Sequence, residues 1–96
     1  MGTLIGGASY YDLPGQTMAD GQPFQGRAMT AAMLHVRLGS TVQVEALNRP
    51  GHAISVTVTD RGPYVAGRII DLTPAAFRAL EGDLGAGVVQ VKVTTP

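Results

Sequence analysis

Apolar and polar residues alternate along three segments of the chain, 41–47, 52–59 and 89–94. A period of two is typical of a β-strand that buries one face and exposes the other. Residues 48–51, Asn-Arg-Pro-Gly, form a turn sequence, so the first two segments predict an antiparallel hairpin. The apolar positions of the three segments are Val42, Val44 and Ala46; Ile54, Val56 and Val58; and Val89, Val91 and Val93.

Two further segments predict strands by composition rather than by alternation. Residues 68–72, Arg-Ile-Ile-Asp-Leu, are short and rich in β-branched side chains, which indicates a more fully buried strand. Residues 5–11 are expected to form another strand. Five or six strands within 96 residues favour a small barrel, because closure removes the exposed edges of a sheet.

One helix is predicted over residues 74–80. Thr73 is a suitable N-cap and Pro74 occupies the position where a first helical residue belongs. Good helix formers follow, and Gly82 is placed to end the helix. A second short helical turn is expected at residues 30–33. The sequence therefore predicts a mostly β domain with one or two short helices.

The overall composition is that of one domain spanning residues 1–96. Thirteen glycines, six prolines and 15% charged residues suit short strands joined by tight turns. Seven basic and seven acidic residues cancel, and no basic stripe is visible, so we expect no nucleic-acid partner. No apolar run approaches the ~20 residues that span a membrane. Residues 1–8 lack the pattern of a secretory signal peptide.

No residue pattern predicts a metal or cofactor site. Cysteine is absent, which excludes disulfides and thiolate ligands. His35 and His52 are not spaced as metal ligands with each other or with an acidic residue. The glycine-rich segments lack the lysine of a phosphate-binding loop. We therefore expect neither a metal nor a cofactor.

Asp60 is the strongest candidate for a chemical role. It has the same parity as Val56 and Val58, so the strand directs it toward the buried face as the chain leaves the sheet. A carboxyl group half withdrawn from water at a barrel rim can serve as a general acid. Arg61 offers a donor nearby, and Gly62 and Pro63 force a turn. The alternative is that Asp60 only caps this turn by accepting backbone N–H groups.

The remaining polar and aromatic residues are weaker candidates. Tyr11 and Tyr64 suit stacking on sugar rings, although tyrosines of small β domains are more often packing residues. Asp71 is expected to brace the turn into the helix. Asp12 and Asp20 lie in a loop that can line a groove. No second carboxylate is placed opposite Asp60, so a two-carboxylate glycosidase is not supported.

Several motifs, in this order and spacing, resemble the rare lipoprotein A family, which is related to lytic transglycosylases and expansins. The motifs are Gly7-Ala8-Ser9-Tyr10-Tyr11, Thr30-Ala31-Ala32, Leu38-Gly39-Ser40, Asp60-Arg61-Gly62-Pro63-Tyr64 and Gly67-Arg68-Ile69-Ile70-Asp71-Leu72. The resemblance covers residues 6–93 and implies a six-stranded double-psi β-barrel. It also implies a bacterial periplasmic or cell-envelope setting, with peptidoglycan glycan strands as the partner. Oligomeric state does not follow from it.

The resemblance further implies a reaction. Some family members are lytic transglycosylases, which cut glycan strands stripped of stem peptides and leave a 1,6-anhydro end. Asp60 matches the family's proposed catalytic aspartate, which protonates the glycosidic oxygen and then accepts the proton of the attacking hydroxyl. His35 is a second, weaker candidate for a catalytic group. The residues expected to bind substrate are Gln22, Gln25, Met33, Arg61, Tyr11 and Tyr64.

The chain departs from the family pattern at three site positions. Gln22 and Gln25 replace the glutamate and the aspartate of a Gly-Glu-x-Phe-Asp motif, and Met33 replaces a histidine. His35, two residues later, is a partial substitute with a different side-chain direction. Weakened or lost turnover is therefore one expectation, which leaves two alternatives open. One is a non-catalytic, expansin-like glycan-binding module, and the other is an interaction module for other envelope proteins.

Overall fold

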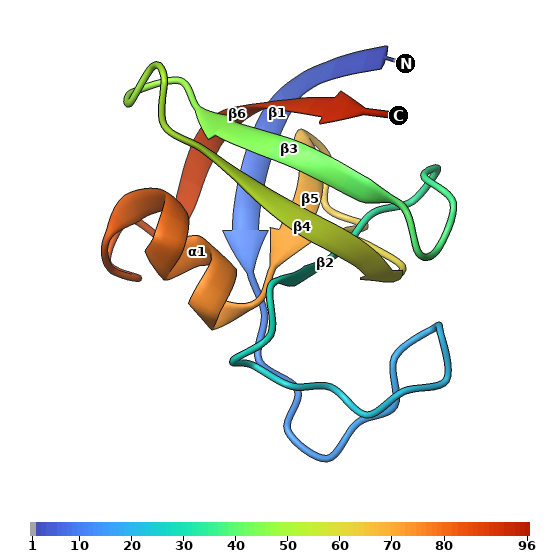
Figure 1. Ribbon diagram of the computed structural model, residues 1–96. Coiled ribbons are helices and arrows are strands. Elements are labelled where there is room, and N and C mark those ends of the chain that lie inside the picture. Colours follow the sequence, from blue (N-terminus) through green and yellow to red (C-terminus); the bar gives the residue numbers. More distant parts are fainter. Residues whose placement is uncertain (1) are drawn as a thin grey trace.

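Six strands close into a barrel in the computed structural model, which describes residues 2–96 (Figure 1). The elements are β1 (Gly2–Tyr10), β2 (Thr30–Ala32), β3 (Thr41–Ala46), β4 (Ala53–Asp60), β5 (Arg68–Leu72), α1 (Pro74–Glu81) and β6 (Val88–Thr95). Their order around the barrel is β1-β5-β2-β4-β3-β6. The pairs β1/β5 and β2/β4 are parallel, and the other pairs are antiparallel. The predicted mostly β, six-stranded barrel is confirmed.

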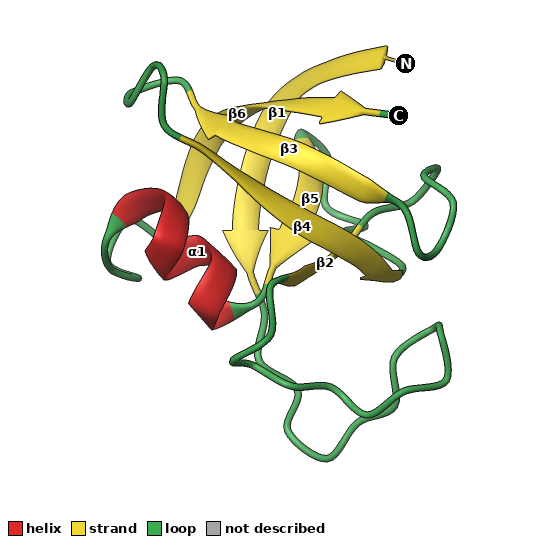
Figure 2. Cartoon of the chain, viewed as in Figure 1, coloured by secondary structure: helices red, strands yellow, loops and turns green. Residues whose placement is uncertain are grey.

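The alternating segments supply the barrel interior. Val44 of β3 pairs with Ile54 of β4 on one side and with Val93 of β6 on the other. The apolar members of β3 are fully buried, as are Val91 and Val93 of β6. Strand β3 thus lies between β4 and β6 in the barrel, and Figure 2 shows it running alongside β4. The predicted hairpin and its buried face are confirmed.

Helix α1 begins and ends where the sequence predicted. The Thr73 hydroxyl accepts a hydrogen bond from the Ala76 N–H at 3.2 Å and donates one to the Ala28 carbonyl at 2.6 Å. Gly82 adopts a left-handed conformation with φ 88° and donates its N–H to the Arg78 carbonyl. This conformation favours glycine because it has no Cβ. Helix α1 lies beside the barrel (Figure 1). Its buried side chains, Phe77 among them, belong to the hydrophobic core.

We expect Thr73→Ala to lower the free energy of unfolding by about 1 kcal/mol, the usual cost of losing a helix N-cap. The loss should exceed this usual cost, because the same hydroxyl also donates a hydrogen bond to the Ala28 carbonyl. Urea denaturation measures the difference. Thr73→Ser, which keeps the hydroxyl, is the matched control. Equal losses in both variants would contradict the capping role.

The predicted helical turn at residues 30–33 is wrong. Residues Thr30–Ala32 form strand β2, and Ala31 pairs with Val58 of β4 and Leu72 of β5. Pairing on both edges of the segment outweighs the local helix preference of alanine.

Two predictions on neighbouring strands also need correction. Strand β5 is not buried on both faces: Ile70 and Leu72 are buried, whereas Ile69 and Asp71 are only half-buried. Strand β1 begins at Gly2 rather than at residue 5, because β6 pairs with it as far as Thr95.

A long connection joins β1 to β2 through residues 11–29. It extends below the barrel in the view of Figure 1. It contains a small hairpin in which Thr17 and Pro23 form a bridge. Met18 and Phe24 are the buried side chains that anchor it. Across residues 2–96, the one helix is too short and polar to cross a membrane.

Candidate functional site

Asp60 is the last residue of β4, and its carboxylate accepts three hydrogen bonds. Oδ1 accepts from the backbone N–H groups of Ala19 and Arg61, each at 2.9 Å. Oδ2 accepts from the Tyr11 hydroxyl at 3.3 Å. The Arg61 bond is the turn cap that the sequence offered as an alternative, while the other two come from the 11–29 connection. Asp60 therefore caps its turn and also ties this connection to the barrel.

Tyr11 lies half-buried beside Asp60. Its ring packs against Phe24 with centroids 5.0 Å apart and planes tilted by 59°. Burial raises the pKa of Tyr11 above its ordinary value of 10.0, and the charge of Asp60 and their hydrogen bond raise it further. Asp71 and Asp20 add smaller contributions in the same direction. The phenol is therefore neutral at physiological pH and donates to the carboxylate.

We expect Asp60→Asn to lower the pKa of Tyr11, because it removes the charge and the carboxylate acceptor that favour the neutral phenol. In the wild type, stability tied to this phenol is complete below pH 10.0 and is lost as the pH rises above it. Ultraviolet absorbance of tyrosinate, with Tyr11→Phe subtracted, measures the shift. Asp83→Asn, on the exposed surface, is the control. Equal titration curves would contradict the contact.

Arg61 turns its guanidinium toward the segment that follows β2. Its Nη1 donates to the carbonyls of Met33 at 3.0 Å and Val36 at 2.5 Å. The Met33 N–H in turn donates to the Asp60 carbonyl at 3.2 Å. These bonds fix the Asp60-Arg61 turn to residues 33–36. Part of the donor capacity of Arg61 is thereby used within the protein, and its substrate-binding role stays a prediction.

Asp71 was missed as a site residue. It lies in β5, where it pairs with Ser9 of β1 and Ala32 of β2, and the Ser9 hydroxyl donates to its Oδ1. Gly62, at φ 132°, lies between Asp71 and Tyr64: a Cβ at Gly62 would be 3.9 Å from Asp71 Oδ2 and 3.8 Å from the Tyr64 ring. The sequence clue to it is an acidic residue that lies between the apolar residues Ile70 and Leu72. A second carboxylate thus lies close to the Asp60 turn.

The candidate residues Gln22 and Gln25 lie on the 11–29 connection with exposed side chains. The Gln22 N–H donates to Asp20 Oδ1 at 2.9 Å, and the Asp20 N–H donates to the Thr59 carbonyl at 3.1 Å. Gln22 is therefore carried by a turn that adjoins the end of β4. Among residues 2–96, neither its amide nor that of Gln25 bonds to Asp60, so both assignments stay predictions.

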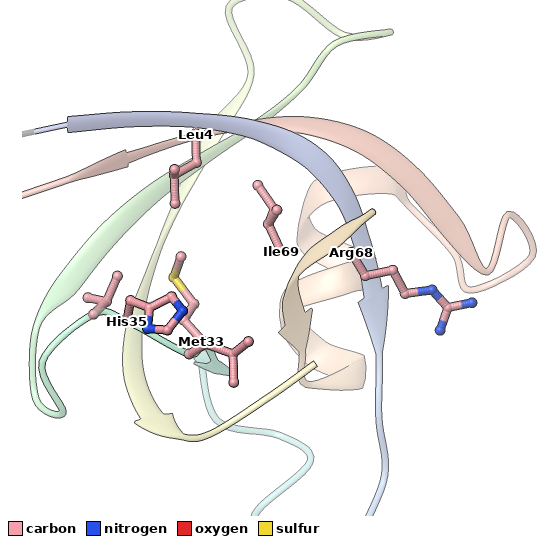
Figure 3. A pocket seen from close by; sticks show the side chains of 7 residues that line it. Leu4, Met33, His35, Arg68 and Ile69 are labelled. Atoms are coloured by element: carbon pink, nitrogen blue, oxygen red, sulfur yellow. The ribbon is translucent and has the colours of Figure 1, made fainter. Parts of the chain in front are cut away.

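Met33 and His35 line an apolar pocket of about 190 Å³ (Figure 3). Met33 is 2% exposed and belongs to the hydrophobic core, whereas His35 is exposed. Both side chains face Leu4 and Ile69 across the pocket, and Arg68 points away (Figure 3). Within residues 2–96 no hydrogen bond joins the His35 ring to the Asp60 carboxylate, and the site roles of Met33 and His35 stay predictions. Tyr64 is 80% exposed.

Residues 3–93 match the family model of double-psi β-barrels that is described as "Lytic transglycolase". The chain belongs to this family. The resemblance noted in the sequence is thereby confirmed, and with it the double-psi barrel. The match covers both motifs around Asp60 and Asp71.

Curated relatives of this chain are named as peptidoglycan transglycosylases. The "Probable endolytic peptidoglycan transglycosylase RlpA" of Nostoc sp. is 39% identical over 90 residues, which are 90% of this chain and 24% of that protein. The "Endolytic peptidoglycan transglycosylase RlpA" of Pseudomonas aeruginosa is 39% identical over 92 residues, 94% of this chain and 26% of that protein. The chain therefore spans about a quarter of the length of these relatives.

Two solved structures share the fold. The Streptomyces papain inhibitor superposes with a TM-score of 0.79 at 26% identity, covering 98% of this chain and 94% of the inhibitor. The expansin of Clavibacter michiganensis superposes with a TM-score of 0.73 at 29% identity, covering 98% of this chain and 50% of the expansin. A barrel of this size thus forms nearly all of one protein and half of another.

Proposed function

We propose that this chain is the glycan-cleaving barrel of a peptidoglycan lytic transglycosylase, with Asp60 as its acid and base. The observation that carries the proposal is the environment of Asp60 at the rim of this family's barrel. Its carboxylate is half-buried and is held by Tyr11 and by two backbone N–H groups. The names of the curated relatives support peptidoglycan as the substrate.

The proposed reaction needs one carboxyl group that both gives and takes a proton. Protonated Asp60 delivers its proton to the oxygen between N-acetylmuramic acid and N-acetylglucosamine as that bond breaks. The C6 hydroxyl of the muramic acid attacks the anomeric carbon and passes its proton to Asp60, which regenerates the acid. The products are a 1,6-anhydro end and a free N-acetylglucosamine end. No water is consumed.

This function places the protein in the bacterial periplasm or cell envelope, where its glycan substrate lies. This location is supported by the names of the curated relatives, which contain the word peptidoglycan. The ring of Tyr64 and the side-chain amides of Gln22 and Gln25 are exposed and are suited to contacting sugars.

Two other functions have specific support. The neutral Gln22, Gln25 and Met33 leave fewer ionisable groups than the family pattern has, which favours a glycan-binding barrel without turnover. The papain inhibitor, in turn, consists almost wholly of this barrel, which favours an inhibitor or interaction module.

Peptide-stripped glycan strands separate the three functions in one experiment. The protein is incubated with the strands, the products are examined by mass spectrometry, and the bound fraction is measured by co-sedimentation. The same preparation is assayed against papain. We expect 1,6-anhydro ends. Binding without products would replace the proposal with the glycan-binding module, and papain inhibition without binding would replace it with the inhibitor.

A further inference from the structure

The two oxygens of the Asp60 carboxylate have different partners. Oδ1 accepts two backbone N–H groups, those of Ala19 and Arg61, both at 2.9 Å. Oδ2 has a single partner, the Tyr11 hydroxyl at 3.3 Å. A backbone N–H only donates, whereas a hydroxyl both donates and accepts. The two oxygens of the carboxylate therefore differ in how readily each can hold a proton.

A proton on Oδ1 would face two N–H donors, and at least one of these bonds would break. A proton on Oδ2 meets only the Tyr11 hydroxyl, which can rotate and accept it. Breaking an Oδ1 bond would cost Asp60 a hydrogen bond from a backbone donor, that of Ala19 or that of half-buried Arg61, whereas a proton on Oδ2 costs neither. The proton of an acid–base cycle at Asp60 is therefore carried on Oδ2.

Tyr11 is held rigidly in place to meet Oδ2. Its N–H donates to the Leu72 carbonyl at 3.0 Å, which fixes the backbone just beyond β1. Its ring packs on Phe24, which is only 6% exposed. A side chain held at both the backbone and the ring has little freedom to leave the carboxylate.

We propose that Oδ2 is the reacting oxygen of Asp60 and that Tyr11 is the positioning residue that aims it. The inference rests on the proposed transglycosylase function and assigns a role within that same site. The charged groups around the pair are Asp20, Asp71 and Arg61. The two carboxylates favour the neutral phenol, and Arg61 is turned toward the Met33 and Val36 carbonyls. Tyr11 therefore keeps its proton and remains available to Oδ2.

The chain supplies a matched control in the adjacent residue. Tyr10 packs on Phe77 with centroids 5.0 Å apart and a tilt of 59°, the same geometry as Tyr11 on Phe24. Within residues 2–96 the Tyr10 hydroxyl makes no side-chain hydrogen bond. Tyr11→Phe and Tyr10→Phe thus remove the same atom from equivalent ring pairs, and only the first removes a contact to Asp60.

The test compares steady-state release of anhydro products by wild type, Tyr11→Phe and Tyr10→Phe. We expect kcat to fall about tenfold in Tyr11→Phe with KM within about twofold, because one hydrogen bond that orients the reacting group is lost. Tyr10→Phe should match the wild type. Unchanged kcat in folded Tyr11→Phe, equal losses in both variants, or a change confined to KM would overturn the positioning role. An inactive wild type would instead refute the proposed function, and this inference with it.

Discussion

Asp60→Asn is expected to reduce the formation of anhydro ends at least ~100-fold, while affinity for glycan strands changes little. Asparagine keeps the shape of the side chain, and its oxygen can still accept from the Ala19 and Arg61 N–H groups. It cannot deliver a proton, and a general acid typically contributes ~10²–10⁴-fold. The lost interaction belongs to the transition state, so kcat should fall while binding of the ground state persists.

Asp83→Asn is the control for this substitution. Asp83 is exposed, carries the same charge and also accepts a backbone N–H, that of Gly85 at 2.9 Å. It should retain wild-type turnover. If Asp60 were only a turn cap, Asp60→Asn would keep its activity and would lose only about 1 kcal/mol of stability, the scale of one hydrogen bond. That result would refute the catalytic assignment.

Phe77→Ala is expected to lower the free energy of unfolding by about 3–5 kcal/mol, the largest stability effect that we predict. Phe77 is fully buried at the point where α1 covers the barrel, and Tyr10 packs on its ring. The truncation removes buried apolar surface and leaves a cavity that the surrounding strands close only in part. Small domains are stable by only about 5–15 kcal/mol, so a large share of the total is lost.

Urea denaturation followed by circular dichroism measures this loss. The neighbouring Arg78 is exposed on the same helix, and Arg78→Ala should stay within about 0.5 kcal/mol of the wild type. A loss below about 1 kcal/mol in Phe77→Ala would mean that the helix does not seal the core in the way the structure shows.

The strands and the helix were predictable because their signals are local. Alternation along 41–47 and 52–59 reflects one buried face, and Thr73 and Gly82 mark the ends of α1 through their own backbone bonds. Strand β2 was not predictable in this way, because it has only three residues and depends on β4 and β5, which follow it in sequence.

The site was predictable only in part for the same reason. Asp60 could be found from its parity in β4 and from the family motif. Its contact with Tyr11 joins residues 49 positions apart, and that of Asp71 with Ser9 joins residues 62 positions apart. Such pairs follow from strand register across the closed barrel, which no local pattern encodes. The expectation that Met33 belongs with Asp60 came from the motif alone and stays a prediction; the side chain is buried in the core.

Cleavage in water enriched with heavy oxygen tests the central claim most directly. A transglycosylase uses the C6 hydroxyl of the substrate as the nucleophile, so its products take up no oxygen from the solvent. The protein is incubated with peptide-stripped glycan strands in the labelled water, and the new ends are identified by mass spectrometry. We predict unlabelled 1,6-anhydro ends that disappear in Asp60→Asn. Labelled reducing ends, or no cleavage by the wild-type protein, would contradict the account.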